Sequence, residues 1–172
     1  MGKGSESENS SISTPDKSLK ILFVCTNNLN CSPTALALLH HYSPVEFPLT
    51  ALGSAGPYSG TTSRGADPRM LALLPNNAKA ILQQHVTKEL SFSIMNSAKN
   101  IIVMDEDSAW AVERLLKENK NDSNFLRFRS LFLDETIYEV PEPTSGMGSF
   151  DEAFKLIDRG IQNLIKKVLI LK

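Results

Sequence analysis

Residues 20–39, KILFVCTNNLNCSPTALALL, decide the fold of this chain. The first six residues form a dense apolar run, which predicts a strand that is buried on both faces. Apolar residues return at helical spacing after Pro33 and predict a helix over residues 34–42. Between the two lies a polar loop from Cys25 to Ser32, placed at the carboxyl end of the strand. A strand, a tight loop and a helix in this order are typical of an α/β domain.

The size and charge of the chain fit one globular domain. Its 172 residues are 41% hydrophobic, which is enough for a sizeable core. Its 18 basic and 19 acidic residues give a formal net charge of −1, so composition favours neither nucleic acid nor an anionic membrane as a partner. No apolar run approaches the length of about 18 residues that a membrane span needs, and no signal-peptide pattern is present. We therefore expect a cytoplasmic protein.

The N-terminal segment differs in composition from the rest of the chain. Residues 1–18, MGKGSESENSSISTPDKS, are rich in Ser and contain one aliphatic residue after Met1. Such a segment cannot bury enough apolar surface to offset the entropy of ordering it. We expect a disordered tail over residues 1–18 and a folded domain over residues 19–172.

Apolar patterning along the domain alternates between strands and helices. Strands are predicted at residues 20–25, 49–55, 100–105 and 130–135. Helices are predicted at residues 34–42, 66–74, 87–95, 107–118 and 149–170. This alternation predicts a doubly wound, three-layer α/β domain with a mainly parallel sheet of about four strands. In such folds ligands bind beyond the carboxyl ends of the strands, and the Cys25 loop lies there.

The loop after the first strand has the chemistry of an anion site. Backbone N–H groups of a tight loop, together with a helix N-terminus, suit a phosphate-sized anion. A cysteine beside such a bowl has a lowered pKa and can act as a nucleophile. A cysteine at a strand end is also often an inert buried thiol, so the residues around Cys25 must decide between the two interpretations.

The segment ILFVCTNNLNCSP, residues 21–33, resembles the active-site segment of the low-molecular-weight protein tyrosine phosphatase family, whose pattern is V-C-x-G-N-x-C-R-S-P. Further segments fall in family order and at family spacing. They are GSAG at 53–56, ADPRM at 66–70, IIVMDED at 101–107 and VPEPTSGMGSFDEAFKLI at 140–157. Several short motifs in order make the resemblance specific although each alone is weak.

The resemblance implies a phosphate-binding loop with Cys25 as the nucleophile and Glu142 as the general acid. Asn28 would brace the loop, and the Ser32 hydroxyl would stabilise the thiolate. The other loop residues that would surround a phosphate are Thr26, Asn27, Leu29, Asn30 and Cys31. The family's reaction passes through a cysteinyl phosphate that water then clears, and it needs neither a metal nor another cofactor.

Five positions depart from the family pattern. Asn27 replaces a glycine, and Asn tolerates a positive φ better than most residues. Asn30 replaces the second cysteine, and Cys31 replaces the arginine. Glu142 replaces an aspartic acid, and Thr144 replaces an aromatic residue. A guanidinium holds phosphoryl oxygens through bidentate, charge-assisted bonds that a thiol cannot make, and its loss costs roughly 10³-fold or more in rate.

These departures leave two functional hypotheses. The first is a family member that has lost turnover, a pseudophosphatase that binds a phosphate-like anion or a phosphorylated protein. The second is an active phosphotyrosine phosphatase that works through Cys25 and Glu142. A plain structural α/β module is a third interpretation. Glu142 itself is either an acid of the site or a solvated residue between two prolines.

Other residues receive structural interpretations. Trp110 falls in a helical apolar pattern and is expected to pack in the core, whereas His85 is expected to be a surface residue. Asp105 or Asp107 is expected to cap the following helix. We place no metal site, because too few Cys, His and carboxylate ligands can be brought together. The resemblance also leaves open a disulfide between the two loop cysteines, because relatives can protect the nucleophile in this way.

Overall fold

The computed structural model of the protein describes residues 21–43, 52–60, 63–122, 125–128, 139–146 and 148–170. The strands are β1 (Ile21–Val24), β2 (Leu52–Ala55), β3 (Asn100–Val103) and β4 (Leu126–Arg127). The α-helices are α1 (Cys31–Tyr42), α2 (Pro68–Leu73), α3 (Asn76–Gln83), α4 (Phe92–Asn96), α5 (Glu106–Glu118) and α6 (Phe150–Ile170), and the 3-10 turn η3 covers Pro143–Ser145. The expected tail and the expected strand at 130–135 lie outside the described residues.

The strands form one parallel sheet in the order β2-β1-β3-β4. Strand β1 is central, and its Leu22 pairs with Gly53 on one side and with Ile101 on the other. The fourth strand, β4, also pairs in parallel with β3. The structure thus confirms the predicted α/β class with a mainly parallel sheet, and it places a strand at 126–127 that the sequence pattern did not predict.

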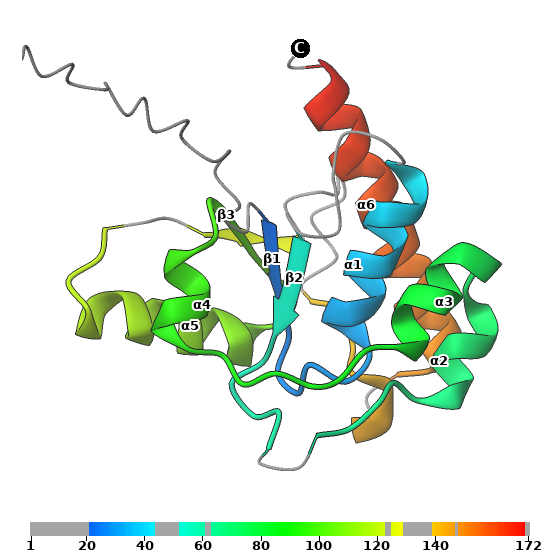
Figure 1. The fold of residues 1–172 in the computed structure, drawn as a ribbon, viewed down its shortest axis with the longest axis horizontal. Coiled ribbons are helices and arrows are strands. Elements are labelled where there is room, and N and C mark those ends of the chain that lie inside the picture. Colours follow the sequence, from blue (N-terminus) through cyan, green and yellow to red (C-terminus); the bar gives the residue numbers. More distant parts are fainter. Residues whose placement is uncertain are drawn as a thin grey trace, which may run out of the picture.

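Alternate residues of β1 point into two separate cores, which is why this strand is apolar throughout. Phe23 packs with α1, α3 and α6 in one core, and Val24 packs with α4 and α5 in the other. Figure 1 shows the resulting layers, with α1, α2, α3 and α6 gathered on one side of the sheet and α4 and α5 on the other. None of the described helices is long and apolar enough to cross a membrane.

Three helices differ from the sequence prediction: α1, α3 and α4, of which α4 covers Phe92–Asn96 instead of residues 87–95. Helix α1 begins at Cys31 instead of residue 34, so Pro33 is its third residue; this is tolerated because N–H groups in the first turn have no partner within the helix. Helix α3 was not predicted. Its start follows Pro75, and its buried residues are only Ala78 and Leu82, which is too few for a clear periodic signal.

Trp110 does not pack in the core. Its side chain is 71% exposed, whereas Val112 of the same helix is fully buried. Two residues span roughly 200° around a helix, so Trp110 and Val112 lie on opposite faces of α5. The prediction that Trp110 packs in the core was therefore wrong. It relied on the aromatic character of the residue and did not take into account its angular position around the helix.

The parallel sheet brings three chain segments together at the carboxyl ends of its strands. The N–H of Cys25 donates to the Ala55 carbonyl at the end of β2, at 3.3 Å. The N–H of Met104 donates to the Val24 carbonyl, at 2.8 Å, and so fixes the end of β3 beside β1. The Cys25 loop, the residues after Ala55 and the start of α5 consequently meet at one edge of the domain.

Candidate active site

Asn28 organises the Cys25 loop from a fully buried position. Its backbone has a φ of 51°, so the left-handed residue of the loop is Asn28 and not Asn27. Its Nδ2 donates to Ser32 Oγ at 2.9 Å, and its Oδ1 accepts the N–H of Lys88 at 2.7 Å. These bonds fix both sides of a turn that a non-glycine residue adopts only when its surroundings compensate the strain.

His85 supports the same turn and is not a surface residue, contrary to the sequence expectation. Its ring is half-buried, and its Nε2 lies 2.7 Å from the Asn28 carbonyl oxygen. Because a carbonyl only accepts hydrogen bonds, Nε2 carries the proton and donates. Burial lowers the pKa of His85. The residue therefore braces the loop from the segment that follows α3.

Cys25 is completely buried at the end of β1. Its Sγ lies 3.0 Å from Ser32 Oγ and accepts the Ser32 N–H at 3.3 Å. The Ser32 hydroxyl accepts from Asn28 and can therefore direct its own hydrogen to the sulfur. Burial nevertheless raises the pKa of the Cys25 thiol to about 12, and the Asp105 carboxylate adds to this rise. Desolvation thus outweighs the two bonds that favour the thiolate.

Gly56 lets β2 lie directly against the loop. A Cβ at this position would come within 2.5 Å of the Cys25 carbonyl oxygen and 2.7 Å of the Asn28 nitrogen. The N–H of Tyr58, two residues further, donates to the Thr26 carbonyl at 2.9 Å. The GSAG segment therefore forms one wall of the loop, and its last glycine is required by close backbone approach.

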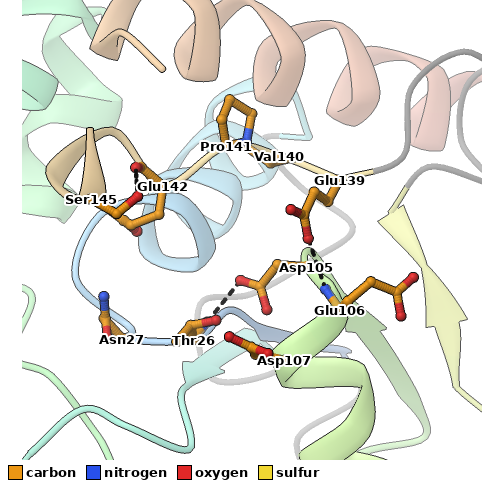
Figure 2. Close-up of a pocket in the computed structure, with 10 residues that line it drawn as sticks. All are labelled: Thr26, Asn27, Asp105, Glu106, Asp107, Glu139, Val140, Pro141, Glu142 and Ser145. Atoms are coloured by element: carbon orange, nitrogen blue, oxygen red, sulfur yellow. Dashed lines mark hydrogen bonds between the residues drawn. The ribbon is translucent and has the colours of Figure 1, made fainter. Parts of the chain in front are cut away.

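Asp105 joins the loop to the start of α5. Its Oδ1 accepts the N–H of Ser108 at 2.8 Å and caps the helix, which confirms the predicted cap. Its Oδ2 accepts the N–H of Thr26 at 2.9 Å, as Figure 2 shows. The Asp105 carboxylate is therefore already bound to the N–H of Thr26, one of the loop residues that are predicted from the sequence to surround a phosphate.

Glu142 faces the opposite end of the loop. Its Oε1 accepts from Asn30 Nδ2 at 3.2 Å and from Thr144 Oγ1 at 2.7 Å. Its Oε2 lies 3.7 Å from the Sγ of Cys31. The residue is half-buried, so the interpretation of Glu142 as a merely solvated residue is wrong. Its carboxylate lies beside the residue at the position of the family arginine.

A cavity of about 490 Å³ lies between these elements. Its lining, drawn in Figure 2, comprises Thr26, Asn27, Asp105, Glu106, Asp107, Glu139, Val140, Pro141, Glu142 and Ser145. Five of these ten described residues are acidic and none is basic. Glu106 is partly neutralised by Arg127, whose Nη1 lies 2.7 Å from its Oε1. Among the described residues, the lining has no cation that could hold a phosphate dianion.

Neither Cys31 nor Arg69 compensates for the missing guanidinium. Burial, to which the neighbouring Glu142 carboxylate adds, raises the pKa of the Cys31 thiol well above its usual range. Both cysteines are free thiols in this structure. Arg69 is paired with Asp67 at 2.8 Å, and its guanidinium lies over the Phe150 ring at 4.3 Å.

The structure gathers most of the predicted site residues, but it also adds three that sequence reasoning placed elsewhere or overlooked. Cys25 and Ser32 are in contact, and Glu142 reaches the end of the loop. His85, Gly56 and Asp105 also support the loop. In the sequence, Gly56 could be recognised only as part of a family motif, and Asp105 only as a candidate helix cap. For His85 no sequence signal was available, because its partner is a backbone carbonyl 57 residues away.

No described group of three or more His, Cys, Asp and Glu side chains has an arrangement that could hold a metal ion. The acidic residues around the cavity are instead used as caps, as loop partners and in the ion pair with Arg127. The described part of the site thus offers thiols, a hydroxyl, amides and carboxylates for its chemistry.

Comparison with known proteins identifies relatives of this arrangement. Residues 20–170 match the family described as low molecular weight phosphotyrosine protein phosphatase. No curated protein sequence matches the chain. YfkJ from Bacillus subtilis superposes with a TM-score of 0.70 at 21% identity, over 90% of this chain and 97% of its own.

Two further solved structures share the fold. The Drosophila arginine phosphatase DARP has a TM-score of 0.73 at 20% identity, over 87% of this chain and 97% of its own. The tyrosine phosphatase Wzb from Escherichia coli K30, solved in complex with phosphate, has a TM-score of 0.67 at 21% identity, over 87% of this chain and 98% of its own.

Proposed function

Because the chain belongs to the low molecular weight phosphotyrosine protein phosphatase family, we propose that it is a member that has lost turnover and retains its loop as a binding site. The observation that carries this proposal is the pair at the end of the loop. Cys31 stands where the family has its arginine, and a Glu142 carboxylate oxygen lies 3.7 Å from its sulfur. A site built for phosphoryl transfer presents a cation there.

Charge supports the loss of turnover. The three equatorial oxygens of a transferring phosphoryl group carry negative charge that must be stabilised. Here the described cavity lining offers five carboxylates and no basic side chain. By analogy with arginines in other phosphoryl transfers, losing the guanidinium alone lowers the rate by roughly 10³-fold, or about 4 kcal/mol.

The state of the nucleophile supports the same conclusion. With a pKa of about 12, Cys25 is a thiol at neutral pH. The thiol form is therefore favoured over the nucleophilic thiolate. The Ser32 hydroxyl and N–H still contact the sulfur of Cys25. The chain thus keeps the hydrogen bonds to its nucleophile but lacks the arginine that would supply positive charge to a bound phosphate.

The ligand we propose is a phosphate-like anion, either free or carried by a phosphorylated protein. The phosphate bound to the related Wzb supports this ligand class, as does a loop whose amides precede helix α1. The net charge of −1 does not favour nucleic acid. Two free, buried thiols fit the reducing cytoplasm, where we place the protein.

An active phosphotyrosine phosphatase is the second candidate. It is favoured by the intact contacts between Cys25 and Ser32 and by the half-buried Glu142 at the loop end. In that reaction the Cys25 thiolate would attack phosphorus, and Glu142 would protonate the leaving phenolate. Water would then release inorganic phosphate from the cysteinyl phosphate.

Turnover of para-nitrophenyl phosphate separates the two candidates. We expect the unmodified chain to release phosphate no faster than a Cys25→Ser variant, which keeps the fold and removes the nucleophile. Activity that is lost in Cys25→Ser would establish the active phosphatase. A Cys31→Arg variant should gain turnover modestly, because the new guanidinium would pair with Glu142 as well as with substrate.

Binding is tested separately from turnover. Inorganic phosphate should raise the melting temperature of the unmodified protein, whereas a purely structural module would show no phosphate-dependent shift. Sodium chloride at matched ionic strength is the control, because it screens charges without occupying the loop.

A further inference from the structure

Four positions at which the chain departs from the family pattern form one contact cluster. Asn30 Nδ2 donates to Glu142 Oε1 at 3.2 Å, and Thr144 Oγ1 donates to the same oxygen at 2.7 Å. Cys31 Sγ lies 3.7 Å from Oε2. The departures at the loop and in the 139–146 segment are far apart in sequence, but they meet around a single carboxylate.

Asn30 ties this cluster to the rest of the site. It is completely buried and precedes α1, but its side chain does not cap that helix. Its Nδ2 instead reaches Glu142, and its Oδ1 accepts the N–H of Asp67 at 3.2 Å. One side chain thus joins the loop to the segments before α2 and before η3. The cysteine of the family pattern could not make both of these bonds.

The side chains of Asn30, Cys31 and Thr144 hold the Glu142 carboxylate at the rim of the cavity. The N–H of Thr144 adds a longer bond of 3.3 Å to Oε1. Glu142 and Pro141 belong to the cavity lining, and Cys31 Sγ also lies 3.8 Å from the Pro141 carbonyl. An anion that approaches the end of the loop therefore meets the negative charge of Glu142 beside Cys31, and Cys31 occupies the position at which the family pattern has its arginine.

We propose that Glu142, positioned by Asn30, Cys31 and Thr144, is an internal carboxylate that closes the loop end and competes with any phosphate-like ligand. The inference rests on the proposed function, because it concerns the control of the same binding site. Glu142 acts through its charge, and Asn30 and Thr144 act by holding it. A ligand must displace this carboxylate or overcome its repulsion, so the resting site binds free phosphate more weakly than it would without this charge.

The charge of Glu142 is tested by calorimetric titration with inorganic phosphate. Glu142→Gln keeps the length and the hydrogen-bonding capacity of the side chain but removes its charge. We expect this variant to bind phosphate roughly tenfold more tightly than the unmodified protein. Glu118→Gln, which neutralises an exposed residue at the end of α5, is the matched control and should leave phosphate affinity unchanged.

The positioning by Thr144 is tested with one variant at this residue and one control variant outside the cavity lining. Thr144 is exposed, so Thr144→Val should fold even where substitution of the buried Asn30 does not. It should raise phosphate affinity about threefold by releasing Glu142, and it should speed amide hydrogen exchange across 142–146. Ser97→Ala is the control, because Ser97 is exposed outside the cavity lining and its hydroxyl donates to the Ile94 main-chain carbonyl.

The outcomes separate the two proposals. Tighter binding in Glu142→Gln and in Thr144→Val, with both controls unchanged, supports the internal carboxylate. If the unmodified protein binds phosphate and Glu142→Gln binds it equally or more weakly, this inference is wrong while the proposed binding function stands. If neither protein binds phosphate, both the inference and the proposed binding function are wrong.

Discussion

The Nε2 of His85 lies 2.7 Å from the carbonyl oxygen of Asn28, the loop residue whose φ is 51°. This single bond links the segment after α3 to the left-handed turn of the Cys25 loop. Together with the Lys88 N–H on Asn28 Oδ1, it holds the turn from outside the loop. The shape of the loop is therefore a property of the tertiary structure.

Replacement of His85 by Ala should destabilise the protein by about 1–2 kcal/mol, because the buried Asn28 carbonyl loses its partner. Urea denaturation measures this loss. His85→Gln, which keeps a donor, should recover part of it. Equal stability of His85→Ala and the unmodified protein would show that the bond does not support the loop.

His85 also predicts a pH dependence. Its pKa in the folded state is lowered from 6.5, mainly by burial. As pH falls below 6.5, the unfolded chain binds a proton at His85 before the folded protein does, so stability should decrease. Melting temperatures between pH 7 and pH 5 should fall more steeply for the unmodified protein than for His85→Gln. Parallel pH profiles would contradict the prediction.

Gly56→Ala should be among the most damaging small substitutions in the chain. The added Cβ would lie 2.5 Å from the Cys25 carbonyl oxygen and 2.9 Å from that of Thr26, and both are backbone atoms that cannot move aside alone. We expect a loss of about 2–4 kcal/mol in the free energy of unfolding.

Gly65→Ala is the matched control for Gly56→Ala. Gly65 is exposed, and the nearest atom to its added Cβ would be the His85 carbonyl oxygen at 3.8 Å, an ordinary contact. Chemical denaturation should therefore show little change at this position. Comparable losses at both glycines would exclude close backbone approach as the cause.

The raised pKa of Cys25 predicts a loss of stability in alkaline solution. The thiol has a pKa near 9.0 when unperturbed and about 12 in the folded protein. Above pH 9 the unfolded chain loses this proton while the folded protein keeps it, so stability should fall with rising pH by up to ~1.4 kcal/mol per unit. Denaturation of the unmodified protein and Cys25→Ala at pH 8 to 10 isolates this contribution; identical slopes would refute it.

Trp110 should contribute little to stability although it is the only tryptophan in the chain. Because its side chain is 71% exposed, Trp110→Ala should change the free energy of unfolding by no more than about 0.5 kcal/mol. Acrylamide should quench its fluorescence strongly in the folded state. Val112→Ala, at a fully buried position on the same helix, should cost clearly more.

Some features of the site could be predicted because they depend on neighbours in sequence. The apolar run of β1 and the polar residues after it located the loop, and Asp105 could be identified as a cap from its position before α5. The missing arginine was visible directly, since Cys31 occupies its place in an otherwise matching segment. These features are encoded in short segments of sequence, so they can be recognised without knowledge of the fold.

Other features depend on residues that are distant in sequence, and no local pattern encodes them. The contact between Asn30 and Glu142 spans 112 positions, and that between Thr26 and Asp105 spans 79. Gly56 could be recognised as essential only once the Cys25 loop was seen to lie against it.

The sequence by itself determined the alternation of strands and helices, the position of the loop and the absence of its arginine, because periodicity, turn chemistry and residue type are properties of short segments. Only the tertiary structure decided that the substituted residues meet around one carboxylate and that Cys25 is fully buried, which raises its pKa. Both depend on packing, which sets the distances between charges and their exposure to water, and these two quantities govern their energies.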